Sequence, residues 1–202
     1  NTPTTDWGLG IAGIVDPVPV HGGIINGCTQ IGFDAQQRPI VAYHKFDAAG
    51  NTQLYNARIE DGNWRVYQGT HWDYRWDFSG LGSITTEILV RPVKLEADGA
   101  LTQSWSHRKY GSERWKLDPD TLAPEKRLAP EPSANPAELR RVESSFPGMG
   151  VQFEQDSGKS NSAEHHFVLR WETLEHNRDR PRDPPWPGPS MLRLYRVYDN
   201  RP

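Results

Sequence analysis

The sequence predicts an all-β fold of short antiparallel strands. Turn-forming residues are frequent, with 18 glycines and 17 prolines among 202 residues, and they interrupt the chain about every dozen residues. Short runs rich in β-branched and aromatic residues lie between them, and the chain holds 8 Trp, 7 Tyr and 6 Phe. Short runs of this kind, separated by turn signals, are typical of β-sandwiches, barrels and propellers.

The first residues predict a loop. Residues 1–5 contain no initiator Met, basic region or apolar stretch that would mark a signal peptide. Residues 8–27 are rich in glycine and read as a connection between strands. We therefore expect the chain to begin inside a longer protein.

The segment 28–69 gives the clearest pattern. It predicts strands at 28–33, 39–46, 52–59 and 64–69, separated by Asp-, Asn- and Gly-containing turns. Four consecutive antiparallel strands in this length match one propeller blade of roughly 40–50 residues. The alternative is an ordinary meander in a β-sandwich.

The rest of the chain repeats the pattern more loosely. We expect a second blade within 84–117, a proline-rich excursion at 118–138 that cannot be a central strand, and final strands at 151–155, 166–173 and 191–198. The chain is thus predicted to be one β-propeller domain, or the C-terminal part of one. A closed four-bladed ring is an alternative to a fragment of a larger ring.

Charge and cysteine content narrow the function. The net charge of −3 is small and not clustered, so we expect neither nucleic acid nor a membrane surface as partner. No apolar stretch approaches the roughly 20 residues needed to cross a bilayer. The single Cys28 excludes an intrachain disulfide and does not fix the compartment.

Several phrases then resemble a known family. They are Pro39-Ile-Val-Ala-Tyr-His-Lys-Phe-Asp-Ala-Ala-Gly-Asn-Thr-Gln, Trp72-Asp-Tyr-Arg-Trp-Asp-Phe-Ser-Gly, Leu169-Arg-Trp-Glu-Thr, Asn177-Arg-Asp-Arg-Pro-Arg and Pro189-Ser-Met-Leu-Arg-Leu-Tyr. Together they resemble the BNR-repeat family that includes seven-bladed propeller polysaccharide lyases of the ulvan lyase type. The resemblance implies a secreted or periplasmic, monomeric protein that cleaves a uronic-acid-containing polysaccharide by β-elimination without an organic cofactor.

That reaction needs three groups. One neutralises the uronate carboxylate, a base removes the C5 proton, and an acid protonates the departing glycosidic oxygen. Histidine suits the base or the neutraliser, tyrosine suits the acid, and arginine suits the carboxylate clamp.

The resemblance assigns a catalytic histidine pair to His21 and His44. His21 lies beside two glycines before the first strand, and His44 lies on the second strand. Neighbouring strands near a propeller axis would let both imidazoles face the channel. The alternative is two polar residues at its rim.

The aromatic stretch 71–78 supplies further candidates. We predict Arg75 and Tyr74 as carboxylate clamp and proton donor, and Trp72 and Trp76 as sugar-stacking platforms. The alternative is a structural plug in which Trp72, Trp76 and Phe78 pack as core and Arg75 pairs with Asp73 or Asp77.

The chain departs from the family in the following blade. Family members there use a tyrosine and an arginine, whereas Glu87 and Gln103 lie nearest by spacing. Tyr110, Arg108 and Arg91 are possible substitutes, and we include Arg91 and Tyr110 among the substrate-binding residues. This gap puts ulvan specificity, and lyase activity itself, in question.

A structural zinc is a second prediction, carried by the resemblance alone. Its ligands would be His107, His165 and His176, with Cys28 as a fourth. The alternative is three exposed loop histidines, since no compact ligand spacing is present.

Two other functions stay open. One is a non-catalytic carbohydrate-binding propeller that uses Trp72, Trp76 and Trp105, and the other is a sialidase-like glycoside hydrolase. The run 177–183 is either a basic lip for a polyanion or a self-paired loop. We expect an acidic polysaccharide as partner in the leading hypothesis.

Overall fold

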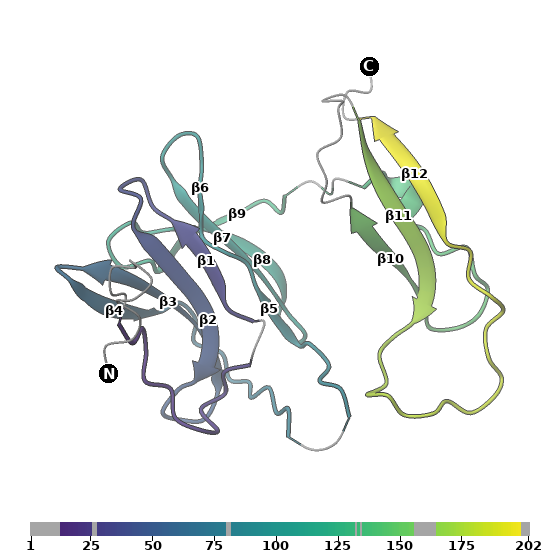
Figure 1. Ribbon diagram of the computed structural model, residues 1–202, viewed down its shortest axis with the longest axis horizontal. Helices are drawn as coiled ribbons and strands as arrows, with labels where there is room; N and C mark the ends of the chain where they lie inside the picture. Colours follow the sequence, from purple (N-terminus) through teal and green to yellow (C-terminus); the bar gives the residue numbers. More distant parts are fainter. Residues whose placement is uncertain are drawn as a thin grey trace, which may run out of the picture. The chain divides into compact units, whose positions relative to one another are not determined.

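The computed structural model shows an all-β chain. It describes residues 13–25, 28–79, 82–131, 133, 135–155 and 165–198. These residues form antiparallel strands and one short 3₁₀ turn, η2 (Ala137–Arg140). In this described part, no helix is long and apolar enough to span a membrane. The chain divides into two compact units, Asn1–Phe78 with Thr86–Glu131 and Ser79–Thr85 with Pro132–Pro202 (Figure 1).

The first unit opens with the four-stranded sheet that the sequence predicts. Its strands are β1 (Gln30–Phe33), β2 (Pro39–Phe46), β3 (Thr52–Glu60) and β4 (Asn63–Gln68), paired antiparallel in chain order. Aspartates close two of its turns. The Asp34 carboxylate accepts the backbone N–H groups of Gln36 and Arg38, and Asp47 likewise accepts those of Ala49 and Asn51.

A second antiparallel sheet completes the first unit. It contains β5 (Ile88–Val90), β6 (Lys94–Leu95), β7 (Leu101–His107), β8 (Gly111–Leu117) and β9 (Pro124–Leu128), in the order β5-β7-β8-β9 with β6 also on β7. The sequence predicted only a connection where β9 lies. Pro124 is the first residue of this edge strand, where its missing N–H costs no ladder bond.

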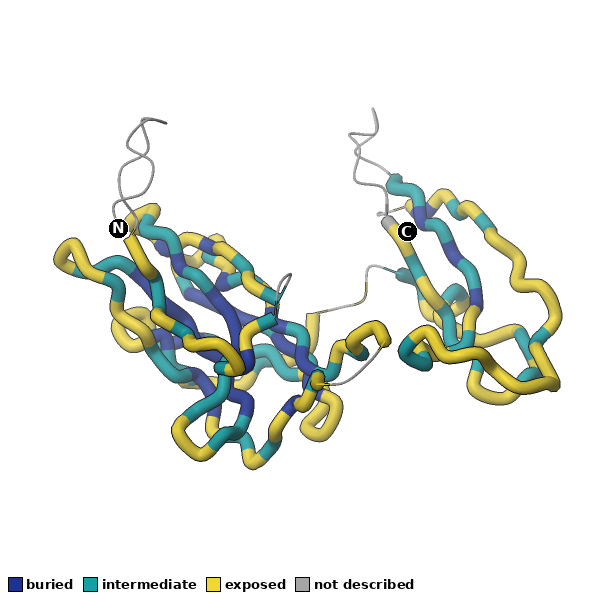
Figure 2. Tube along the Cα trace, turned by 60° about the horizontal axis from the view of Figure 1, so that its bottom comes forward, coloured by how far each residue is buried: buried dark blue, intermediate teal, exposed yellow. Residues whose placement is uncertain are grey.

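The core of the first unit lies between its two sheets. One buried cluster joins Ala42 and Leu54 of the first sheet to Trp105 of the second, and another joins Ile40 to Leu101. Figure 2 shows the buried segments concentrated along the strands of this unit. Gly32 permits the close approach of β1, because a Cβ there would lie 1.9 Å from the Val93 carbonyl oxygen.

The second unit is a three-stranded antiparallel sheet. Its strands β10 (Met149–Gln155), β11 (His165–Leu174) and β12 (Arg193–Tyr198) pair in chain order and match the predicted final strands. Arg170 is buried and donates to the Leu139 and Arg141 carbonyls at 2.8 and 2.7 Å, and to Glu172 at 2.6 Å. These bonds fasten the segment around η2 to the sheet.

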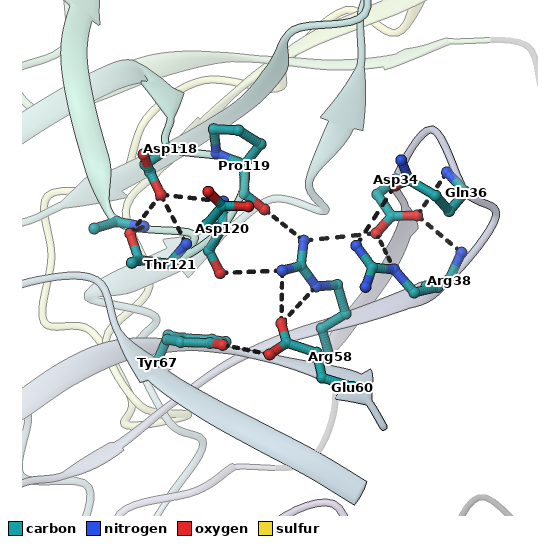
Figure 3. A network of polar contacts seen from close by, with 11 residues as sticks. Asp34, Gln36, Arg38, Arg58, Glu60, Tyr67, Asp118, Pro119, Asp120 and Thr121 are labelled. Carbon is teal, nitrogen blue, oxygen red and sulfur yellow. Dashed lines mark hydrogen bonds and ion pairs between the residues drawn. The ribbon is translucent and has the colours of Figure 1, made fainter. Parts of the chain in front are cut away.

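A buried arginine links the two sheets of the first unit (Figure 3). Arg58 donates to the carbonyls of Pro119 and Asp120 at 2.7 and 3.0 Å, just beyond β8. Its guanidinium also pairs with Glu60 at 2.6 Å and lies 3.6 Å from Asp34. Because every partner is an acceptor, removing the cation would leave several oxygens without a donor.

We predict that Arg58→Met lowers the free energy of unfolding by about 3 kcal/mol, the range expected when one partner of a buried ion pair is removed. Urea denaturation of parent and variant measures the difference. The matched control is Arg65→Met, since Arg65 lies directly across on β4 and is exposed. Equal losses in the two variants would contradict a special role for Arg58.

Candidate functional site

Topology brings several loops of the first unit to one end. In an antiparallel meander of four strands, three parts lie at the same end of the sheet: the start of the first strand, the turn between the second and third strands, and the end of the fourth strand. The corresponding segments are 13–25, 47–51, 69–78 and the β7–β8 turn 108–110. We call these segments the loop end. Figure 1 shows the end of β2 beside the loops that precede β1 and follow β4.

Three aromatic rings surround His107 at the loop end. The centroid of its imidazole lies 4.5 Å from that of Trp72 and 4.7 Å from those of Tyr74 and Tyr110. His107 is buried, and its Nδ1 accepts the backbone N–H of Lys109 at 3.0 Å. Burial lowers the pKa of His107. A neutral imidazole therefore holds the three rings and the β7–β8 turn together.

Glu87 fixes the position of Tyr74. The Tyr74 hydroxyl donates a short hydrogen bond to one carboxylate oxygen of Glu87, and Arg108 donates to the other at 2.8 Å. Burial raises the pKa of the Tyr74 phenol, and the hydrogen bond and charge of Glu87 raise it further. The phenol is consequently protonated at neutral pH.

Aromatic faces and cations lie together on this surface. Trp72 and Tyr110 are stacked, with centroids 6.3 Å apart and planes at 18°, and Tyr110 is 37% exposed. Arg108 and Lys109 are exposed beside them, and Lys109 pairs with Asp73 at 2.8 Å. We call Trp72, Tyr74, Arg108, Lys109 and Tyr110 the aromatic–cation patch. Such a surface can stack a pyranose ring and pair with its carboxylate.

The two predicted catalytic histidines differ in environment. His21 is exposed at a positive φ of 64°, in a loop held to β2 by the Phe46 N–H bond to the Gly22 carbonyl. His44 is fully buried, and the centroid of its ring lies 5.1 Å from that of Trp76. Neither ring nitrogen has a hydrogen-bond partner among the described residues. Burial lowers the pKa of His44 to about 4. His44 is therefore neutral and enclosed.

The remaining predicted residues of stretch 71–78 have structural contacts. Trp76 is 2% exposed and belongs to the core, as the packing alternative for this residue predicted. This burial leaves no face of the ring accessible to a sugar. Arg75 donates to the Gly50 carbonyl at 2.8 Å and lies 3.8 Å over the Phe46 ring.

Arg91 and Gln103 have neighbours other than the residues of the aromatic–cation patch. Arg91 is exposed in a groove of about 990 Å³ that Ser104 and Arg114 also line. Gln103 is buried and exchanges two side-chain hydrogen bonds with Asn56, at 2.9 and 3.1 Å. The structure thus gives the two positions nearest the family residues different surroundings, with Glu87 at the patch and Gln103 in the interior.

Comparison with known proteins adds one finding. Residues 9–72 match the model of a family described as a BNR repeat-containing family member. The match supports a BNR-repeat family. No curated protein and no solved structure matches the chain.

The BNR-matched segment covers the first sheet and both predicted catalytic histidines. It ends at Trp72, so most of the aromatic–cation patch lies beyond it. The sequence did not predict that Glu87 holds Tyr74 in place. Tyr74 follows the last strand of the first sheet and Glu87 precedes the first strand of the second, so no local sequence signal joins them.

The predicted zinc ligands fall in both units. Cys28 is partly buried against the core of the first unit, where burial raises the pKa of its thiol. His107 lies in the same unit, whereas His165 and His176 belong to the second. Among the residues that the structure describes, no group of three or more His, Cys, Asp or Glu side chains is arranged to hold a metal. The zinc stays a prediction.

Burial of His44 predicts an acid-sensitive fold. Because its folded pKa of about 4 lies below the ordinary value of 6.5, the unfolded state binds more protons between these values. Stability therefore falls as the pH drops from 7 to 4, by about 3 kcal/mol from this group.

Urea denaturation at both pH values tests this, and we expect His44→Leu to lose that part of the pH dependence. The control His71→Leu, at an exposed histidine of the same unit, should keep it because His44 is retained. An unchanged pH dependence in His44→Leu would show that protonation of His44 does not destabilise the fold.

Proposed function

We propose that this chain binds an acidic polysaccharide at the loop end of its first unit. The aromatic–cation patch carries this proposal. Its stacked Trp72 and Tyr110 are aromatic rings of the kind that sugar rings pack on, Tyr110 is partly exposed, and Arg108 and Lys109 lie next to them. Uronate residues combine both properties, since each carries an apolar ring face and a carboxylate.

The patch is held ready for a ligand. His107 and Glu87 fix the rings from within, so little conformational freedom is lost on binding. The ion pair between Lys109 and Asp73 is exposed and contributes little to stability. A uronate carboxylate can therefore replace Asp73 at small cost.

The architecture proposed for this function is a propeller. Two successive antiparallel meanders in the first unit support blades in a larger ring, and one turn of each meander, β2–β3 in the first and β7–β8 in the second, lies at the loop end. Loops at one end of the blades would then surround a channel. An extracellular polysaccharide as ligand goes together with a secreted or periplasmic location.

A second candidate is a lyase that uses the same surface. The protonated Tyr74 phenol favours it, because β-elimination needs an acid for the leaving oxygen. His21 would remove the C5 proton, the C4–O bond would break as the C4–C5 double bond forms, and Tyr74 would protonate the departing oxygen. Arg108 or Arg75 would pair with the carboxylate. His44 is enclosed and would support the loop carrying His21 rather than touch the substrate.

We expect Tyr110→Ala to weaken binding to polygalacturonate or alginate about tenfold, the effect of losing roughly 1.4 kcal/mol. Affinity electrophoresis or titration calorimetry of the 202-residue chain measures this. Tyr198→Ala is the matched control, because Tyr198 is an exposed tyrosine of the second unit. Equal affinity of the parent and Tyr110→Ala would remove the patch from the binding site.

If the lyase candidate is right, incubation with uronate-containing polysaccharides produces near-ultraviolet absorbance from C4–C5 unsaturated ends. Tyr74→Phe should then abolish the rise and keep binding, because only the hydroxyl is lost. No absorbance on any substrate, beside retained binding, would reject the lyase and leave the binding function.

A further inference from the structure

One tryptophan of the second unit, Trp186, lines two hollows. Trp186 lines a groove of about 710 Å³ and also a second hollow of about 610 Å³. Both volumes fall in the range of small-molecule sites. Trp186 is 66% exposed, which is unusual for the largest apolar side chain.

The indole is fixed even though it is exposed. Its Nε1 donates to the Arg182 carbonyl at 2.9 Å, and Arg182 in turn donates a short hydrogen bond to the Glu175 carbonyl. Pro184, Pro185 and Pro187 lie next to Trp186 in the sequence and restrict the backbone around it. The indole N–H is therefore satisfied, and the apolar faces of the ring are what remains for a ligand.

The groove offers hydrogen-bonding groups around this ring. Its walls come from the β10–β11 ladder and the loop that follows β11, and the polar side chains among them include Gln152, Thr173, Glu175, His176, Asn177 and Arg182. Trp171 adds a second aromatic side chain. Amides, a hydroxyl and charged groups around aromatic rings suit a ligand with many hydroxyls and apolar ring faces.

We propose that the second unit carries a glycan subsite in which Trp186 stacks a pyranose ring. The polar side chains of the groove would bond its hydroxyls, and the second hollow that Trp186 lines would receive a neighbouring sugar of the same chain. Within the run 177–183, Asn177 donates to the Arg180 carbonyl, Arg178 donates to the Ser79 carbonyl, and Asp179 accepts the Ser83 backbone N–H. The run forms a wall of this subsite rather than a free basic lip for a polyanion. This subsite does not depend on the aromatic–cation patch.

The test uses the full 202-residue chain with polygalacturonate, alginate and xylan in affinity electrophoresis. Trp186→Ala should weaken binding to at least one of them about tenfold, and Trp186→Phe, which keeps a ring, should restore part of it. Leu192→Ala is the matched control, since Leu192 is equally exposed at 66% in the same unit and lines neither hollow. Circular dichroism checks that each variant is folded.

Comparison with Tyr110→Ala separates this inference from the proposed function. Loss of affinity in Trp186→Ala alone would support the subsite and reject the patch, and loss in Tyr110→Ala alone would do the reverse. The subsite is overturned if Trp186→Ala binds all three polysaccharides as the parent does, if Leu192→Ala is equally weakened, or if the parent binds none of them.

Discussion

Burial of Trp76 between the two sheets of the first unit is the constraint on which the loop end depends. Trp76 sits in the main core cluster, and its backbone N–H donates to the Thr52 hydroxyl at 2.9 Å. From this anchor the chain alternates, so that positions 72, 74 and 78 are also partly buried while 73, 75 and 77 are exposed. The anchored segment places Trp72 and Tyr74 against His107, and the aromatic–cation patch is therefore an extension of the core.

The same core explains why the histidines have unlike properties. A residue on the inward face of β2 is enclosed by the packing that stabilises the sheet, as His44 is. A residue in the glycine-rich loop before β1 is exposed, as His21 is. Burial lowers the pKa of His44 and encloses its ring, so packing decides the properties of this residue.

Sequence reasoning located most strands because turn residues and β-branched or aromatic runs are local signals. It missed β9, because the proline-rich stretch that contains this strand carries no such signal. The strand forms there because it pairs with β8. It could not tell that Trp76 is buried while Trp72 is only partly buried, because both lie in one aromatic run and the difference arises from the second sheet. The Tyr74–Glu87 pair is likewise formed by tertiary contact, although Trp72, Tyr74 and Tyr110 were each selected for their chemistry.

The close approach of Gly32 to the Val93 carbonyl limits which residues position 32 can hold. A side chain at position 32 would meet backbone, which no rotamer change can relieve, so the two sheets would have to separate. If that separation moves the β7–β8 turn, it carries Tyr110 away from Trp72. Under the proposed function, affinity for a sugar would then depend on a residue that never touches one, and mutational tolerance at position 32 would follow the geometry of a distant surface.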